Sequence, residues 1–231
     1  MSDPITDKAR LHPVGHGYDR RDGMPVSILV HATHGRPGTS LRQETGYLLH
    51  SAAVSAHYLI GRAGEVVALL APQWRAWHAG RARLPFGNND SIGIELHAAR
   101  TEPITPAQRA ALTTLVRDLM ARYAIPAACL ETHAAAALPT GRKSDPAAWP
   151  RADFLAWRAA LAAPARRATA RHVAWVRAAP STASAHIATL ARGAQVGIAE
   201  VVPGEAVAGG LAQWAQLTSG GYVWLPQLEG V

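Results

Sequence analysis

The segment Val26–His31, with the sequence VSILVH, is a short run of mostly apolar residues that ends in a histidine. A run of this kind is typical of a central strand that is buried on both faces. Polar groups at the end of such a strand lie at the sheet edge, where sites are usually built. His31 and His34 face opposite sides of an extended chain. We therefore expect His31 in a site and His34 in a loop-structural or outer role.

A second polar stretch, ETHAAAALPTGRKSDP at residues 131–146, carries His133, Lys143 and Asp145. Neutral imidazole and carboxylate are both zinc ligands, and a lysine two residues before the carboxylate can point into the same cleft. The combination is weak evidence by itself, because loops often contain these residues. The histidine at the end of the first strand strengthens it, and the two stretches together indicate a metal site.

The segment 91–97, SIGIELH, alternates, with Ile92, Ile94 and Leu96 on one face and Glu95 on the other. A buried glutamate needs a partner. Glu95 is therefore either part of a structural ion pair or a general base whose pKa is tuned by burial and a nearby cation.

Three further features of the sequence are His57, the motif RAWHAG with the loop that follows it, and the single cysteine. His57 lies within an apolar run, where a hydrogen-bonded core histidine is favoured over direct chemistry. Trp77 and His78 in RAWHAG, followed by a loop containing Asn89, suit either a plain core or the wall of a sugar or peptide site. The single cysteine, Cys129, excludes an internal disulfide framework and is interpreted as a small buried hydrophobe.

The remaining elements of the first 160 residues alternate between strands and helices. Residues 1–24 are polar and turn-rich and are expected to be an irregular lead-in. Capping boxes predict helices after Ser40 and after Thr105, the second ending at Pro126. A hairpin is predicted over 54–60 and 65–70, and a closing helix around Phe154.

The character of the chain changes near residue 171. Residues 164–171 are interpreted as a linker, and five short strands separated by Gly, Ser and Pro turns follow in 172–231. This pattern predicts a small all-β barrel after a first domain at 1–163. The predicted strands are 173–177, 186–190, 195–202, 211–217 and 222–225.

Charge and hydropathy narrow the functional classes. The net charge of +7 and the pI of about 10.3 favour polyanionic surroundings, yet the basic residues are scattered, which disfavours a nucleic-acid surface. No apolar run reaches the length of a membrane span. The first residues lack the apolar core of a signal peptide, so synthesis in the cytosol without such a signal is expected.

In combination, several motifs resemble the type 2 N-acetylmuramoyl-L-alanine amidases, a family that includes peptidoglycan recognition proteins and phage endolysins. The motifs are SILVHATHG, VSAHYLIGRAGEVVALL, RAWHAG, NNDSIGIEL and THAAAALPTGRKSDP, in the family's order over about residues 24–160. The C-terminal part, with VRAAPSTASAHIATLARGAQV and GYVWL, resembles a bacterial SH3-like domain of cell-wall hydrolases.

The resemblance implies an α/β fold, with a mixed central β-sheet flanked by helices, plus a small C-terminal all-β SH3-like barrel. It places Zn²⁺ on His31, His133 and Asp145, an oxyanion-stabilising role on Lys143 and the general base on Glu95. Ala56 stands where some phage members carry a tyrosine, which favours Glu95 further. A second-shell role for His57 and substrate contacts for Trp77, His78 and Asn89 complete the expected site.

The implied reaction is hydrolysis of the amide between N-acetylmuramic acid and L-alanine of bacterial peptidoglycan by zinc-activated water. A phage or prophage endolysin, acting on the wall after release, accounts for both the missing signal and the second domain. The alternatives are a cytosolic amidase that recycles anhydro-muropeptides and a non-catalytic peptidoglycan-binding protein. No nucleic-acid partner or membrane span is expected, and the oligomeric state stays open.

Overall fold

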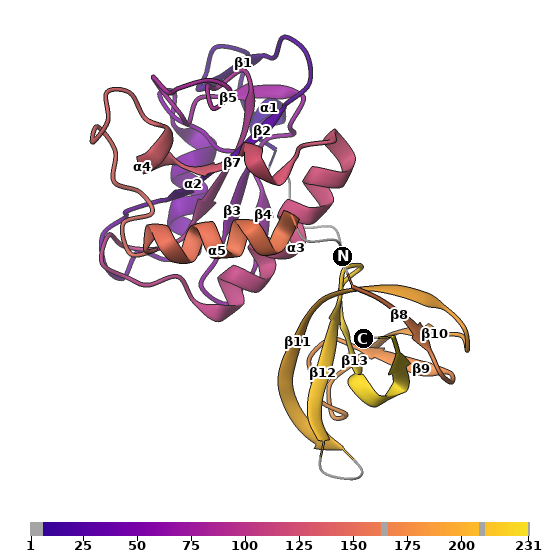
Figure 1. Ribbon diagram of the computed structural model, residues 1–231. Coiled ribbons are helices and arrows are strands. Elements are labelled where there is room, and N and C mark those ends of the chain that lie inside the picture. Colours follow the sequence, from indigo (N-terminus) through magenta and orange to yellow (C-terminus); the bar gives the residue numbers. More distant parts are fainter. Residues whose placement is uncertain (1–6, 163–165, 208–210, 231) are drawn as a thin grey trace. The chain divides into compact units, whose positions relative to one another are not determined.

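The computed structural model describes residues 7–162, 166–207 and 211–230. The chain forms two compact units, Met1–Ala162 and Ala163–Val231 (Figure 1). Each unit has hydrophobic clusters of its own. In the described part of the chain, no helix is both long enough and apolar enough to cross a bilayer.

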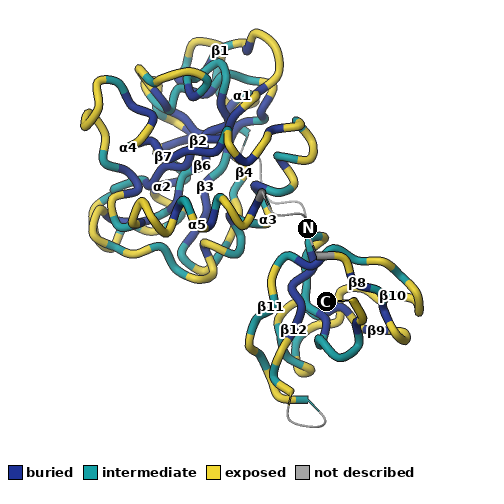
Figure 2. Tube along the Cα trace, viewed as in Figure 1, coloured by how far each residue is buried: buried dark blue, intermediate teal, exposed yellow. Residues whose placement is uncertain are grey.

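The centre of the first unit is a five-stranded mixed sheet in the order β4-β3-β6-β2-β7. The three inner strands and β7 run parallel, while β3 and β4 form an antiparallel hairpin, as the sequence predicts. The bounds are β2 Ser27–Ala32, β3 Tyr58–Ile60, β4 Val66–Ala68, β6 Ser91–Leu96 and β7 Leu130–Thr132. The inner strands are almost wholly buried (Figure 2).

One face of this sheet packs against α3 (Pro106–Tyr123) and α5 (Arg151–Ala162). Ile28, Val30, Ile92 and Ile94 alternate on that face, because neighbouring side chains on a strand point to opposite sides. Their helix partners are Leu112, Val116 and Leu119 from α3 and Phe154, Trp157 and Leu161 from α5. The predicted capping box at Thr105 and Gln108 forms at the start of α3.

The opposite face carries the polar residues that follow the apolar run. In β2 and β6, Leu29, His31, Gly93 and Glu95 belong to this alternate set. The register pairs His31 with Glu95 across the two parallel strands. The helix α2 (Leu41–His50) belongs to this side of the unit, because its Leu48 and Leu49 cluster with Leu59 of β3. One face of the sheet is therefore apolar core, and the other bears the candidate site.

The expectation of an irregular lead-in over residues 1–24 is wrong for part of it. Residues 8–11 form α1 (Lys8–Leu11), and β1 (Tyr18–Arg20) pairs antiparallel with β5 (Trp74–Ala76). Lys8 Nζ donates to the carbonyl oxygens of Leu48, Leu49 and Ser51, at 3.0, 3.0 and 2.6 Å. These carbonyls lie at the end of α2, where the last carbonyl groups of a helix have no amide partner within the helix. A buried long-range contact thus orders a segment whose composition is typical of a loop.

A buried carboxylate fixes the strand that leads into the second polar stretch. Glu131 of β7 is 2% exposed at its side chain and accepts hydrogen bonds from Arg83 and Arg151, while Arg158 lies 3.7 Å away. Burial alone would raise the pKa of Glu131, but the bonds from Arg151 and the Thr132 amide outweigh it and lower the pKa. This network anchors the backbone just before His133.

The second unit is a seven-stranded antiparallel sheet in the order β10-β9-β13-β12-β11-β8-β14. Its strands are β8 Arg166–Ala170, β9 Ala174–Arg177, β10 His186–Leu190, β11 Gln195–Val207, β12 Leu211–Leu217, β13 Tyr222–Trp224 and β14 Leu228–Glu229. All five predicted strands are present, within a few residues at their ends.

The predicted linker at 164–171 is wrong for residues 166–170. These residues form β8, which pairs with both β11 and β14, and Ala168 and Ala170 are buried in the core of the second unit. Their small side chains fit the interior although arginines flank them in sequence. Residues 164 and 165 lie outside the described residues.

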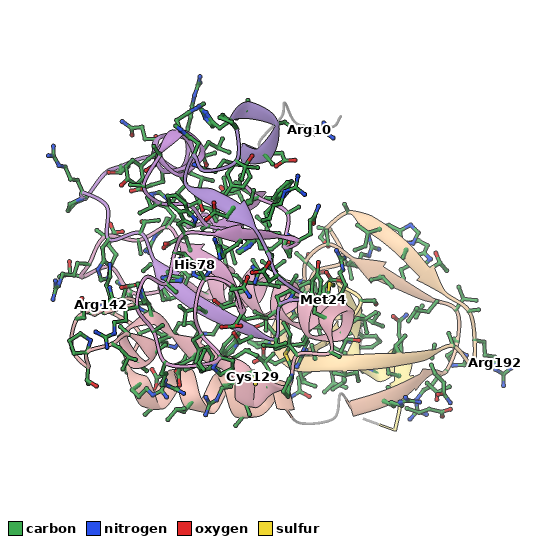
Figure 3. The ribbon with its side chains drawn as sticks, turned by 90° about the horizontal axis from the view of Figure 1, so that it is seen from above. Arg10, Met24, His78, Cys129, Arg142 and Arg192 are labelled. Carbon is green, nitrogen blue, oxygen red and sulfur yellow. The ribbon has the colours of Figure 1, made fainter. Side chains whose placement is uncertain are left out.

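The loop between α3 and β7 contains one short 3₁₀ helix, η1 (Ala127–Cys129). Cys129, labelled in Figure 3, is half-buried and packs beside the core cluster of the first unit. Cys129 therefore packs as a small hydrophobic residue, as predicted, but it is half-buried and not fully buried. A second 3₁₀ helix, η2 (Leu225–Gln227), precedes β14.

Candidate metal centre and catalytic cleft

Three side chains from distant parts of the sequence meet where β2 ends. His31 Nδ1 lies 3.0 Å from His133 Nδ1, and Asp145 Oδ2 lies 3.2 and 3.0 Å from these two nitrogens. All three residues are buried. His133 starts the short helix α4 (His133–Ala136), whose N-cap is Thr132. Side chains alternate along β2, which directs His31 to this place, and His133 follows directly after the end of β7. The three residues that the sequence predicts as metal ligands therefore lie together.

The hydrogen bonds around His133 fix its tautomer. Its Nε2 lies 3.0 Å from the carbonyl oxygen of Ala79, which can only accept. We therefore assign the proton of a neutral His133 to Nε2. The lone pair is then on Nδ1, which faces His31 and Asp145.

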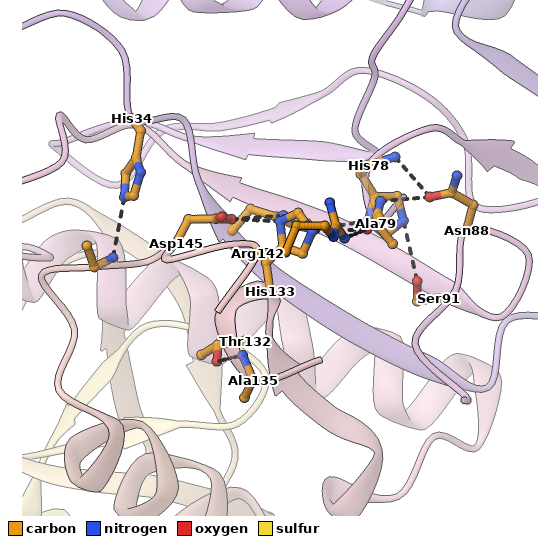
Figure 4. A network of polar contacts seen from close by, with 12 residues as sticks. His34, His78, Ala79, Asn88, Ser91, Thr132, His133, Ala135, Arg142 and Asp145 are labelled. Atoms are coloured by element: carbon orange, nitrogen blue, oxygen red, sulfur yellow. Dashed lines mark hydrogen bonds and ion pairs between the residues drawn. The ribbon is translucent and has the colours of Figure 1, made fainter. Parts of the chain in front are cut away.

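Hydrogen bonds through His78 and Ser91, which are labelled in Figure 4, fix the tautomer of His31 in the same way. Ser91 Oγ donates to the Gly87 carbonyl at 2.7 Å and lies 3.4 Å from His78 Nε2. With the proton of His78 on Nε2, His78 Nδ1 accepts from His31 Nε2, 2.9 Å away. His31 Nδ1 is left as a lone pair. Gly93 is required here, because a Cβ at that position would lie 2.5 Å from His78 Cγ.

The three side chains His31, His133 and Asp145 are suited to bind a cation. Two imidazole lone pairs and a carboxylate oxygen, all within 4.8 Å of one another, point at one place. Acceptors converge in this way only around a cation or a shared proton, and two nitrogens plus one oxygen are ligands that zinc takes in catalytic sites. His78 and the Ala79 carbonyl are the outer partners that orient such histidines.

Burial keeps three histidines of this region, His31, His57 and His78, neutral. It lowers the pKa of His31 to about 4, against a smaller opposing effect of the adjacent Asp145 carboxylate. Burial also lowers the pKa of His57 to about 3 and that of His78 well below its usual value. Burial by itself would raise the pKa of Asp145, but its close contacts with the His133 and His31 rings prevail and hold it low. Asp145 is therefore in the ionised state that binds metal, and His31 is in the neutral state that does so.

Glu95 lies in the same cleft with one oxygen unsatisfied. Its Oε2 is buried and has no hydrogen-bond partner. Burial, with smaller effects of Asp145 and Glu44, raises the pKa of Glu95 well above its usual value, and Lys143 opposes this shift. No structural ion pair is recorded for Glu95 among the described residues. Of its two interpretations, the structure supports a titrating group over a paired one.

A cleft of about 340 Å³ surrounds these groups. Lys143 lines it with an exposed side chain, on the same loop as Asp145. His34 also lines it, and His34 Nε2 accepts from the Ala147 amide at 3.4 Å, in keeping with a loop-structural role. The remaining lining includes Ala32, Thr33, Glu44, Tyr47, Leu48, Val54, Ser55, Trp77, His78, Arg142 and Ser144.

The other predicted residues fall into different places. Trp77 lines the cleft, and its Nε1 donates to Asp19 Oδ2 at 2.7 Å. His78 lines the cleft too, but its ring nitrogens are taken up by His31 and Ser91. His57 is fully buried, with Nδ1 accepting from the Gly93 amide and Nε2 donating to the Trp74 carbonyl.

Asn89 does not line the metal cleft, so any contact that it makes with substrate lies outside that cleft. Its side chain exchanges hydrogen bonds with the backbone of Asp22, and it borders a separate depression. The neighbouring residue, Asn88, holds the backbone beside the cleft in place. Asn88 Oδ1 accepts from the amides of His78 and Ala79, at 3.0 and 2.7 Å.

Sequence reasoning missed Asn88, Ser91, Arg142 and Glu44. Arg142 NH2 donates to the carbonyls of Ala79 and Arg81, so Ala79 O receives both Arg142 and His133. Asn88, Ser91 and Arg142 lie within the motifs NNDSIGIEL and PTGRKSDP, which was the available signal, whereas Glu44 belongs to α2 and lies in neither motif. Their pairing depends on loops that meet only in the folded chain.

Comparison with known proteins agrees with this geometry. The family model described as N-acetylmuramoyl-L-alanine amidase matches residues 21–148. The 1,6-anhydro-N-acetylmuramyl-L-alanine amidase AmpD of Salmonella typhimurium (strain SL1344) is 40% identical over 104 residues, 42% of this chain and 54% of that protein. AmpD of Escherichia coli (strain K12) is 40% identical over 96 residues, 40% of this chain and 51% of that protein. The chain spans about half the length of these curated relatives.

Solved structures show the same fold. A crystal structure of a selenomethionine derivative of AmpD has a TM-score of 0.50 and 32% identity, covering 63% of this chain and 92% of that one. The catalytic domain of XlyA has a TM-score of 0.51 and 25% identity, covering 64% and 93%. Because the family model covers more than half of the 231 residues and its span contains the three converging donors, the chain belongs to the N-acetylmuramoyl-L-alanine amidase family.

Proposed function

We propose that this protein is a zinc-dependent peptidoglycan hydrolase that cleaves the amide between N-acetylmuramic acid and L-alanine of the stem peptide. The observation that carries the proposal is the convergence of His31 Nδ1, His133 Nδ1 and Asp145 Oδ2 in a cleft that also holds Glu95. A non-catalytic binding protein would have no need for three convergent donors beside an unpaired, proton-accepting carboxylate.

His31, His133 and Asp145 would hold the zinc ion. When bound, zinc supplies Lewis acidity toward water and the amide carbonyl. The protein's own contribution is to orient both imidazole rings, through His78 for His31 and through the Ala79 carbonyl for His133. Three protein ligands leave room for substrate, as catalytic zinc sites do.

Glu95 is proposed to take the proton from the attacking water and to pass it to the leaving amine. Its raised pKa suits both steps, because a base must hold the proton long enough to return it as an acid. No other group of the described residues holds its Oε2 by a hydrogen bond, so the carboxyl group is not committed to a structural partner there. His31 and Glu95 are register partners, so their side chains leave the same face of the sheet.

Lys143 is proposed to stabilise the oxyanion that develops on the carbonyl oxygen. Its side chain lines the cleft and is free to adjust to substrate. Removing an oxyanion donor usually costs about a hundred- to thousandfold in rate. Trp77 is proposed to contact the substrate from the cleft wall.

The second unit is proposed to be an SH3-like domain that binds the wall. Residues 166–231 hold five Arg and three Glu, a net charge of +2. Their aromatic groove of about 210 Å³ is lined by Val173, Trp175, Arg177, Thr182, Val207, Trp214, Trp224 and Gln227. Trp175 is 54% exposed and Val173 is 60% exposed, so both offer apolar surface in this groove to a ligand.

An endolysin-like enzyme acting on polymeric wall accounts for both units. A recycling amidase for anhydro-muropeptides is the second candidate, and the 40% identity to AmpD favours it for the first unit. The presence of the second unit favours polymeric wall, rather than soluble muropeptides, as the substrate. Endolysins of this kind act on the wall after release from the cytosol.

Mass spectrometry of products from purified sacculi tests the proposal. The expected products are free stem peptides beginning with L-alanine and an intact glycan. Muropeptides released with peptides still attached would show that another bond is cut. Absence of any product from sacculi, with cleavage of soluble anhydro-muropeptides, would support the recycling candidate instead.

A further inference from the structure

Beside the catalytic cleft lies a second depression of about 310 Å³, bordered by Asp19, Arg75, Trp77, Asn88 and Asn89. Trp77 borders both hollows. The neighbouring residue, His78, contacts the ligand His31. The depression and the catalytic cleft therefore share the Trp77 side chain as a common border.

The walls of this depression are rigidly held. Asp19 and Arg75 are register partners on the β1–β5 ribbon, and Arg75 NH2 donates to Asp19 Oδ2 at 2.8 Å. The same oxygen accepts from Trp77 Nε1. The indole is therefore fixed by its edge, and the depression is built before any ligand arrives.

The chemistry of the depression is that of a saccharide site. An aromatic ring offers a stacking surface, while a carboxylate, a guanidinium and amides offer donors and acceptors in fixed positions. Asp19 and Arg75 neutralise each other, so the depression favours an uncharged ligand. The cations Arg142 and Lys143 line the catalytic cleft and are not part of the depression.

We propose that this depression is a subsite for a further N-acetylated sugar of the glycan strand. The inference rests on the proposed amidase function. The scissile amide joins an uncharged glycan to a peptide rich in carboxylates, and each suits a different part of the surface. The glycan extends past Trp77 over Asp19 and Arg75, while the peptide meets the cations of the cleft. The subsite selects long glycan over a single muropeptide.

The test uses two soluble substrates with the same stem peptide, one on a single N-acetylmuramic acid and one on a glycan of several disaccharides. The full-length protein is expected to show a lower KM for the longer substrate. Arg75→Gln and Asp19→Asn should shrink that KM ratio, by an amount on the order of tenfold for one lost charged hydrogen bond. Arg20→Gln is the matched control, because Arg20 is exposed on the same strand but outside the depression.

A second measurement does not depend on hydrolysis. Chitotetraose, a four-sugar chain of N-acetylglucosamine, should bind the chelator-treated protein and its Arg20→Gln variant, as seen by saturation-transfer NMR, and bind Arg75→Gln much more weakly. Thermal melts establish that the variants are folded. Equal KM values for both substrates, or binding of chitotetraose that Arg75→Gln leaves unchanged, overturns the subsite while cleavage of the short substrate keeps the amidase function. Loss of all hydrolysis by the unaltered protein would refute the amidase function instead, and the chitotetraose experiment would still decide the subsite.

Discussion

His78 Nδ1 lies 2.9 Å from His31 Nε2, and this contact decides which nitrogen of His31 faces Asp145. His78 has a role that its sequence neighbourhood does not reveal. In RAWHAG it follows a tryptophan and resembles part of a ligand wall. In the folded chain it supports a candidate metal ligand.

Replacing His78 should weaken metal binding more than it weakens folding. His78→Ala removes the acceptor for His31 Nε2–H, and losing such an outer partner typically costs about 10- to 100-fold in metal affinity. Competition with a chromogenic zinc chelator measures the change. His172→Ala, an exposed histidine of the second unit, is the control. An unchanged zinc affinity in folded His78→Ala would falsify the supporting role.

Glu95→Gln should separate metal binding from turnover. The amide keeps the shape of the side chain but cannot hold the transferred proton, so we expect roughly a hundred- to ten-thousandfold loss in kcat. Zinc content should remain near one per chain by elemental analysis. His31→Ala should lose the metal as well as the activity, because it removes a ligand.

Glu200→Gln in the second unit serves as the control for Glu95→Gln. If Glu95→Gln retained most of its activity, the proton acceptor would have to be another group. Chelation of the unaltered protein should abolish activity, and restored zinc should recover it. Full activity in chelator with no zinc in the protein would contradict the metal proposal.

Lys8 should make stability depend on pH in the alkaline range. Burial lowers the pKa of Lys8 from 10.5 to about 8 in the folded protein. Between these values the unfolded chain binds more protons than the folded one, so the free energy of unfolding rises as pH increases from about 8 toward 10.5. Lys8→Met removes this rise and leaves three carbonyls at the end of α2 without their donor.

Urea unfolding at pH 7.5 and 9.5 checks the prediction for Lys8. The unaltered protein should gain more stability between the two pH values than Lys8→Met does. Arg10→Met, an exposed change in the same short helix, should behave like the unaltered protein. Parallel pH profiles for all three proteins would count against the lowered pKa of Lys8.

Much of the fold and of the candidate site can be predicted from the sequence, because local patterns of apolar and polar residues determine these parts. The alternation in SIGIEL puts Glu95 opposite the core face, and the run ending at His31 places that residue at the sheet edge. The β8 strand and α1 could not be found this way. Their burial comes from partners far along the chain, such as β11 for Ala168 and the end of α2 for Lys8. The positioning role of Asn88 could not be predicted either, because adjacent amides in a loop have no periodicity that distinguishes them.

The last prediction concerns the division of labour between the two units. A tethered binding module raises the local concentration of substrate without changing the chemistry. The proposed metal ligands, together with Glu95 and Lys143, all lie in residues 31–145, and each unit has its own hydrophobic core. A chain ending at residue 162 should therefore cleave small soluble muropeptides about as fast as the full protein but bind and lyse insoluble sacculi less well.

Trp175→Ala in the full chain should reproduce the loss on sacculi, because Trp175 lines the aromatic groove. Val66→Ala, an exposed apolar change in the first unit, is the control. Equal losses on soluble and insoluble substrate would instead assign the second unit a purely structural role.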